Sequence, residues 1–163
     1  MRMKSKGFTL VETLIYLGLF VLLIIVIIDS ISAISTSYKN IKELRAIESS
    51  AMASMDRMIS EIRNANSVDT ADTTFNSNPG QLSLINGTST RKFYVLNNRL
   101  MINEDGSIGP LTGSDIKVTS LIFRSIATTT SSAVKIELSL RNVASSTSLT
   151  ENFYMTATLR GSY

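Results

Sequence analysis

The sequence predicts an α+β protein in which one long N-terminal α-helix, membrane-spanning in its first half, packs on an antiparallel β-sheet. Three observations lead to this prediction. Residues 14–28 contain no charge and no proline, and the apolar residues that follow recur at steps of three and four. From Gln81 onward, apolar and polar residues alternate instead. The change from steps of three and four residues to steps of two predicts a helix followed by a sheet. The chain length of 163 residues allows one compact domain beside the apolar segment.

The first element is an apolar segment that is long enough to cross a bilayer. Counted from Phe8 to residue 28, it has about 21 residues and spans roughly 31 Å as a helix. One carboxylate, Glu12, lies within it, and a charge inside a bilayer costs about 2.5–3.5 kcal/mol on insertion scales. Glu12 therefore either benefits from the dipole at the helix N-terminus or pairs with a cation supplied by a partner.

A short basic leader precedes the apolar segment. Its positive residues are Arg2, Lys4 and Lys6. Positive residues beside a membrane segment favour the cytoplasmic side, so the chain after the apolar segment is expected outside the cytoplasm. An ordinary secretory signal is cut after its apolar region, and residues 31–33 (Ile-Ser-Ala) offer a passable site for that alternative. Asp29 marks the expected return to water.

The helix is expected to continue from about Thr9 to about Asn64, because no proline interrupts this stretch. Met52, Met55 and Met58 fit either an adaptable binding surface or, as we favour, filler between helix and sheet. Arg57 and Glu61 are expected on a solvated or subunit-facing side. One face of the continuation collects the apolar positions: Ile31, Ile34, Tyr38, Ile41, Leu44, Ile47, Ala51, Met55, Met58 and Ile62.

Five to six antiparallel strands are expected after a polar connection over residues 64–80. Asn86-Gly87 is a strong hairpin signal, and residues 97–98 and 104–106 are expected to be turns. Residues 109–113 are expected to be a loop, as are 128–132 and 144–150. In the strand at 116–126, Val118, Leu121 and Phe123 are the candidate inward residues. The expected strands cover residues 81–85, 91–96, 99–103, 116–126, 134–140 and 153–159.

Composition argues against several classes of function. The net charge of +3 comes from 16 Lys+Arg against 13 Asp+Glu, but the leader holds three of the positive residues and no acid. The chain after residue 7 is therefore balanced, and direct nucleic-acid binding is not expected. The absence of His and Cys removes the commonest general base, thiol nucleophile and transition-metal ligands, so we expect neither an enzyme nor a cofactor. Asp69 and Asp72 alone are weak grounds for calcium.

The start of the chain carries a resemblance to a known family. After the basic leader and before the apolar segment stand Gly7, Phe8, Thr9, Leu10, Val11 and Glu12. This run resembles the type IV prepilin cleavage and methylation signal of type IV pilins, type II secretion pseudopilins and competence pilins. The resemblance implies a pilin-like fold, cleavage by prepilin peptidase between Gly7 and Phe8, and N-methylation of Phe8. It also implies that Glu12 of an incoming subunit pairs with the Phe8 amine of an assembled one.

A fainter resemblance concerns the branch of the family. Residues 55–65, together with residues 121–123, are similar to minor pseudopilins of the J type and minor pilins of the W type. Many pilins also carry a proline in the apolar helix and a C-terminal disulfide, and this chain departs from both patterns because residues 8–78 contain no proline and the chain contains no cysteine.

The resemblance also implies an organisation, a location and partners. Residues 1–7 would be the leader, 8–30 the transmembrane and filament-core segment, 31–64 the amphipathic continuation, and 65–163 the β-sheet head. The subunit would first cross the cytoplasmic membrane once, with its head extracytoplasmic, and then join a cell-surface or periplasmic filament. Its partners would be other pilin or pseudopilin subunits, prepilin peptidase, the inner-membrane assembly platform and, before assembly, membrane lipid.

Two classes of function remain open from sequence. The first is a filament subunit that serves a type IV pilus, a competence system or type II secretion. The second is a single-pass, membrane-anchored binding domain that never polymerises. The first class predicts processing at Gly7 and sensitivity to changes at Glu12, whereas the second predicts neither.

Overall fold

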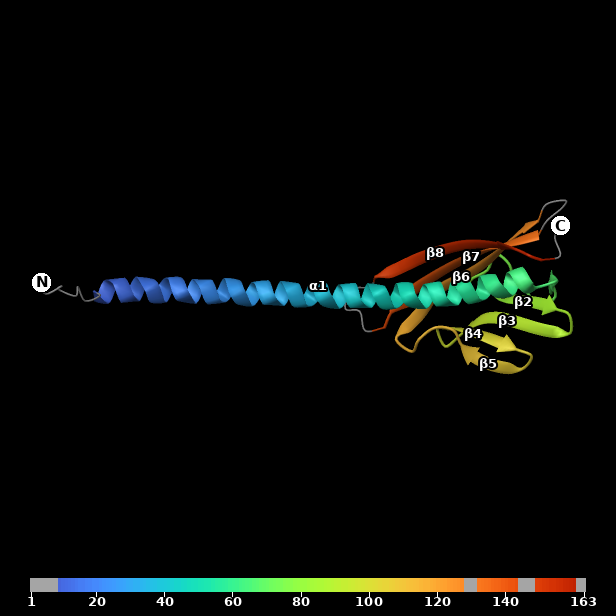
Figure 1. Ribbon diagram of the computed structural model, residues 1–163, viewed down its shortest axis with the longest axis horizontal. Helices are drawn as coiled ribbons and strands as arrows, with labels where there is room; N and C mark the ends of the chain where they lie inside the picture. The colour runs from blue at the N-terminus through green and yellow to red at the C-terminus, as the bar shows by residue number, and fades with distance from the viewer. Residues whose placement is uncertain (1–8, 128–131, 144–148, 161–163) are drawn as a thin grey trace, which may run out of the picture. The chain divides into compact units, whose positions relative to one another are not determined.

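The computed structural model describes residues 9–127, 132–143 and 149–160, which form one helix and eight strands (Figure 1). This order of elements confirms the α+β class. The chain divides into two compact units, Met1–Ile41 and Lys42–Tyr163. The elements are α1 (Leu10–Asn64), β1 (Ser67–Val68), β2 (Leu82–Asn86), β3 (Ser89–Leu96), β4 (Arg99–Glu104), β5 (Ser107–Pro110), β6 (Ile116–Ala127), β7 (Ser132–Asn142) and β8 (Thr150–Thr158).

The first unit consists of the N-terminal part of α1. Its predicted helical character is confirmed, and α1 begins one residue after the predicted start and ends at the predicted residue. Every side chain from Leu10 to Ile41 is exposed except that of Glu12, which is half-buried. By length and composition this part of α1 could cross a membrane, and none of its most apolar stretch is buried.

The C-terminal part of α1 belongs to the second unit and supplies one wall of its core. The predicted apolar face is buried there at every position from residue 47 on: Ile47, Ala51, Met55, Met58 and Ile62. The predicted role of the methionines as filler is right for Met55 and Met58 but wrong for Met52, whose exposed fraction is 62%. Met52 and Met58 lie about 60° to opposite sides of Met55 around the helix, and the buried face extends to the side of Met58.

Two antiparallel sheets pack in this unit, where the sequence predicted one. The first sheet has the order β1-β2-β3-β4-β5, and the second has the order β6-β7-β8. The additional strands, β1 and β5, have two and four residues; β1 lies within the predicted polar connection, and β5 overlaps the predicted loop at residues 109–113. Such short strands carry too few alternating residues to be recognised by their period.

The turns between the strands explain their pairing. Gly87 has a φ of 63° in the β2–β3 hairpin, and Asn97 and Asn98 have φ values of 52° and 60° between β3 and β4. Gly and Asn tolerate this left-handed region better than other residues, so these positions permit tight turns. The predicted turn at 97–98 is confirmed, and the hairpin predicted from Asn86-Gly87 is present with its turn one residue later, at 87–88.

The core of the second unit joins α1 to both sheets. Its largest fully buried side chains include Phe93 of β3 and Phe123 of β6. Val118, Leu121 and Phe123 are buried as predicted, although a step of three from Val118 to Leu121 breaks the two-residue period. A register shift between Val118 and Ser120 supplies the extra residue, so both side chains face inward.

Candidate functional site

The first turn of α1 is built around Thr9. Its hydroxyl accepts a hydrogen bond from the backbone N–H of Glu12 at 3.3 Å, and its carbonyl accepts one from the N–H of Thr13 at 3.2 Å. Thr9 and Glu12 have the three-residue spacing of a capping box, a signal that was present in the sequence. The acid thus lies in the first helical turn, where the helix dipole favours a negative charge.

The carboxylate of Glu12 has a partner that sequence reasoning missed. The hydroxyl of Tyr16 donates a hydrogen bond to Oε1 of Glu12 at 3.1 Å. The two residues are four apart, and this spacing places side chains on the same face of a helix, so the contact could have been inferred from sequence. Tyr16 therefore joins Glu12 in the candidate site.

The polar side chains within the apolar segment are satisfied by the helix itself. Residues 10–28 contain three of them, Glu12, Thr13 and Tyr16. The hydroxyl of Thr13 donates to the carbonyl of Leu10 at 2.8 Å, and the other two are bonded to each other. Hydroxyl groups that bond to the preceding turn spare the cost of an unpaired donor in an apolar medium. The segment is thus suited to a bilayer or to a cluster of apolar helices.

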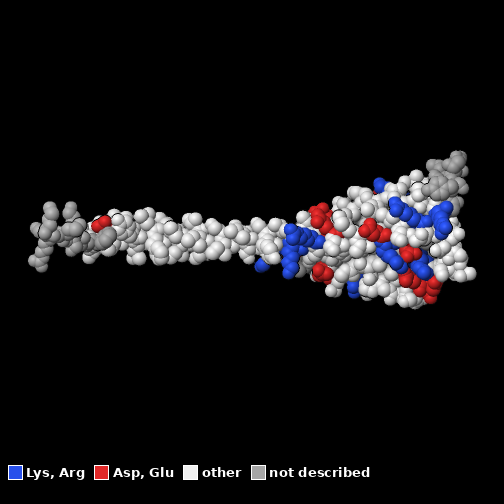
Figure 2. All heavy atoms as spheres, viewed as in Figure 1, with Lys and Arg blue, Asp and Glu red and all other residues white. Residues whose placement is uncertain are grey.

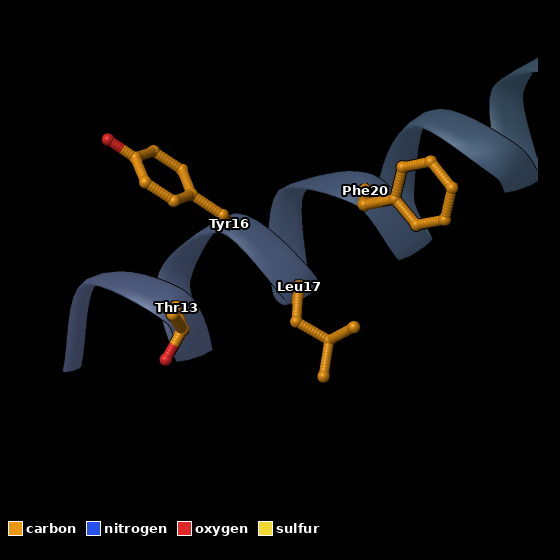
Figure 3. Close-up of a pocket in the computed structure, with 4 residues that line it drawn as sticks. All are labelled: Thr13, Tyr16, Leu17 and Phe20. Carbon is orange, nitrogen blue, oxygen red and sulfur yellow. The ribbon is translucent and has the colours of Figure 1, made fainter. Parts of the chain in front are cut away.

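A groove runs along this part of α1 without forming an enclosed cavity. Its lining residues are Thr13, Tyr16, Leu17 and Phe20, and Figure 3 shows their side chains standing out from a single helix. In Figure 2 the face shown of this helical segment is nearly uncharged, whereas charged side chains gather on the second unit. Large exposed apolar surfaces of this kind mark sites of contact with proteins or membranes.

The structure does not describe the two residues that are predicted to flank the cleavage site. Gly7 and Phe8 lie outside the described residues. Of the three predicted site residues, Glu12 alone is described, so the proximity of its carboxylate to a Phe8 amine remains a prediction.

The charged side chains of the second unit form a cluster that ties α1 to the first sheet. Arg57 pairs with Glu61 at 2.9 Å and with Glu104 of β4, and Arg91 of β3 lies 3.8 Å from both carboxylates. Arg57 is solvent-exposed, as expected, whereas Glu61 is half-buried. Both residues also pair with a strand, Arg57 with Glu104 of β4 and Glu61 with Arg91 of β3, because they lie beside the buried face of α1.

The same cluster shifts two pKa values. The backbone N–H of Thr90 and the guanidinium of Arg91 lower the pKa of Asp105. The hydrogen bond to Asp105 raises the pKa of Arg91, against a smaller opposing effect of burial. Both groups remain charged over the neutral range, which is consistent with a structural role.

No metal-binding group emerges from the part of the chain that the structure describes. Within residues 9–127, 132–143 and 149–160, no three His, Cys, Asp or Glu residues are placed to share an ion. Asp72 pairs with Lys92 at 2.8 Å, and Asp69 accepts a hydrogen bond from the N–H of Ala71 at 3.1 Å. Asp69 and Asp72, the two residues that gave weak grounds for calcium, thus have contacts within the protein.

No protein-family model, no curated protein and no solved structure matches this chain. The fold and the site define a class by themselves: an α+β protein whose described residues include one candidate membrane span, near the N-terminus. The function must therefore be argued from the residues of α1.

Proposed function

We propose that the chain is a pilin-like structural subunit, of the minor kind, of a type IV pilus, competence or type II secretion filament. The observation that carries this proposal is the exposed apolar part of α1. Residues 10–28 hold a single charge, and none of this apolar surface is covered within the described chain. A helix of this kind requires lipid before assembly and other apolar helices after it.

Glu12 has the central role in the proposed assembly. Cleavage after Gly7 creates a cation, the Phe8 amine, about one helical turn before Glu12. In the filament core, Glu12 of an incoming subunit pairs with the Phe8 amine of a subunit already assembled. This pairing compensates two charges that would be costly if left alone in an apolar environment, and it fixes the axial register of the subunits.

The proposal includes the route to the filament. The basic leader keeps the N-terminus cytoplasmic, prepilin peptidase removes it, and the assembly platform of the inner membrane extracts the subunit from lipid. The head remains extracytoplasmic throughout. The proposed role is structural and involves no catalysis and no cofactor.

The N-terminus of the membrane-derived protein tests this proposal. We expect mass spectrometry to find a chain that begins at Phe8 with an N-methyl group. The control is Gly7→Val, whose side chain should obstruct the peptidase and leave the leader attached. A wild-type chain that begins at Met1 would favour the membrane-anchored binding domain, and one that begins near Ile34 would indicate an ordinary secretory signal. Either result would overturn the proposal.

A further inference from the structure

The outer face of the first sheet, which points away from α1, carries apolar side chains. In β3 and β4 the core takes Phe93, Leu100 and Ile102, and successive side chains of a strand point to opposite faces, so the alternate residues face outward. Four of these outward residues form what we call the outer patch: Tyr94, Leu96, Arg99 and Met101. Cross-strand pairing joins Tyr94 to Met101 and Leu96 to Arg99, and Leu96 is 49% exposed. Because the solvent face of an antiparallel sheet is usually polar, this patch indicates a contact surface.

Arg99 is the charged residue of the outer patch, and it lacks an acidic partner. It is half-buried, its Nη2 donates to the carbonyl of Thr112 at 2.8 Å, and its Nε is buried without a hydrogen-bond partner. None of the ion pairs within residues 9–127, 132–143 and 149–160 includes Arg99. Hydrogen bonds between a guanidinium and a carboxylate are among the strongest in proteins. The outer patch therefore fits a surface that offers a carboxylate beside an apolar side chain.

The exposed side of α1 in the same unit offers such a pair. Met52 and Asp56 are both exposed, and their four-residue spacing places them on one face of the helix. Asp56, like Arg99, takes part in none of the ion pairs of the described chain. The next cations along this face are Arg45 and Arg63, each about 10 Å along the helix from the nearer member of the pair. Met52 and Asp56 thus complement the outer patch in charge and in apolar character.

The two surfaces lie at the same level along α1 and on opposite sides of the second unit. The hydroxyl of Ser54 donates to the carbonyl of Leu111 at 3.2 Å, and the next residue, Thr112, accepts the hydrogen bond of Arg99. The outer patch therefore lies at the level of Ser54, which stands between Met52 and Asp56 in the chain. A step of two residues turns an α-helix by about 200°, so both of these side chains project to the side opposite Ser54 and the first sheet.

We propose that the outer patch docks the Met52–Asp56 face of a second copy of the chain, in which Asp56 pairs with Arg99 and Met52 packs against Leu96. The argument for a second copy is that one contact satisfies two unpaired charges, of opposite sign, that the same chain presents. Because the two surfaces are level and on opposite sides, a sideways displacement without inversion brings them together.

This contact is heterologous, since two different surfaces meet, and it leaves α1 of both copies running in the same direction. The inference rests on the proposed function, in which both copies are anchored in one membrane and need this common direction. Two adjacent copies suffice to form the contact, so it does not require the chain to be an abundant subunit.

A mixture of two single-cysteine variants of the full-length chain in detergent tests the contact, because the natural chain contains no cysteine. One variant carries Met52→Cys and the other Leu96→Cys, with tags of different mass. After mild oxidation, we expect at least fivefold more mixed disulfide dimer than dimer of either variant alone on non-reducing gels. The matched control replaces Leu96→Cys by Ile126→Cys, a similarly exposed position (44%) on β6 of the second sheet. No mixed dimer, or equal yields from the control or from Met52→Cys alone, would overturn the proposal.

An exchange of charges tests the predicted ion pair. Asp56→Arg in the Met52→Cys chain, or Arg99→Glu in the Leu96→Cys chain, should each lower the yield of mixed dimer at least threefold. The two changes together should restore it, because they reverse the pair across the contact, and a merely structural effect would not be rescued in this way. Asp56 is exposed on α1, so Asp56→Arg keeps the test valid if Arg99→Glu fails to fold, as circular dichroism would show. An unchanged yield with Asp56→Arg, or no restoration between two folded variants, would contradict the proposed contact.

The contact and the proposed function can fail separately. A chain that begins at Phe8 but gives no mixed dimer overturns the contact alone. A mixed dimer from a chain that keeps its leader supports the contact and overturns the proposed function.

Discussion

The two parts of α1 contain the same kinds of apolar residue in opposite environments. Ile47 is fully buried, whereas Ile34 is 69% exposed, although both lie on the apolar face predicted from one continuous period. The difference lies in what covers them. From Ile47 onward the two sheets of the same chain bury the face, while the N-terminal part has no covering element among the described residues.

The two parts also treat charge differently. In the second unit, charges are numerous and are paired between elements, as with Arg57 and Glu104. In residues 10–28 there is one charge, Glu12, and its hydrogen bond comes from the neighbouring turn. The comparison shows that one end of α1 is covered by its own chain, and that the other end, which by length and composition could cross a membrane, is uncovered among the described residues.

The largest expected effect comes from a comparison in which one isoleucine in each part of α1 is truncated to alanine. Ile47→Ala should lower the free energy of unfolding of the second unit by about 2–5 kcal/mol, because it leaves a cavity in a packed core. Ile34→Ala, the matched control, should change it by less than about 0.5 kcal/mol. Chemical denaturation in detergent, followed by circular dichroism, measures both. Equal losses would mean that residues 31–41 are also part of that folding unit.

A second effect, which depends on the proposed function, concerns Glu12. Glu12→Gln keeps the shape and removes the charge, and Glu12→Val also removes the desolvation cost. Both variants should insert and be cleaved, but we expect about tenfold less incorporation beside wild-type subunits, equivalent to about 1.4 kcal/mol. Tyr16→Phe, which removes only the hydroxyl that bonds to Glu12, should have a smaller effect.

The measurement for Glu12 is the ratio of variant to wild type in sheared filaments divided by that ratio in membranes. Filament number is counted as well, because loss of a minor subunit at a tip reduces the number of filaments. If Glu12→Gln leaves both quantities unchanged, Glu12 has no assembly role and serves only the first turn of α1.

The smallest expected effect concerns a half-buried charge in the second unit, Glu137. Hydrogen bonds from Arg124 and then Lys135 lower the pKa of Glu137 to about 2 from 4.5. Because the pKa is lower in the folded state, this pair contributes stability above about pH 4.5 and loses it as the pH falls towards 2. The contribution is small because Arg124, which has the largest effect on this pKa, is solvent-exposed.

An NMR titration of the Glu137 carboxyl tests this assignment. Arg124→Gln should raise the pKa of Glu137, because the two hydrogen bonds at 2.9 and 3.1 Å are lost. Lys117→Gln, at the start of β6, is the matched control and should leave it unchanged. The assignment fails if the two variants titrate alike.

Much of the secondary structure could be predicted because it depends on local periodicity. The helix was predicted to within one residue, and the six longer strands were found because each has enough residues to show alternation. The location of Glu12 within the first helical turn followed from sequence, and its contact with Tyr16 was accessible from the four-residue spacing. The processing of Gly7 and Phe8 remains a prediction because these residues lie outside the described chain.

Other features were decided only by tertiary structure. The sequence did not separate two sheets, because alternation shows which side of a strand faces inward but not which strands pair. It did not distinguish buried Met55 from exposed Met52, and it did not place Arg57 beside Glu104, because both outcomes depend on where the sheets meet α1. The position of Arg99 beside Leu96 follows from strand pairing, which is a long-range property. Local sequence therefore determined the elements, and long-range packing determined which surfaces they leave uncovered.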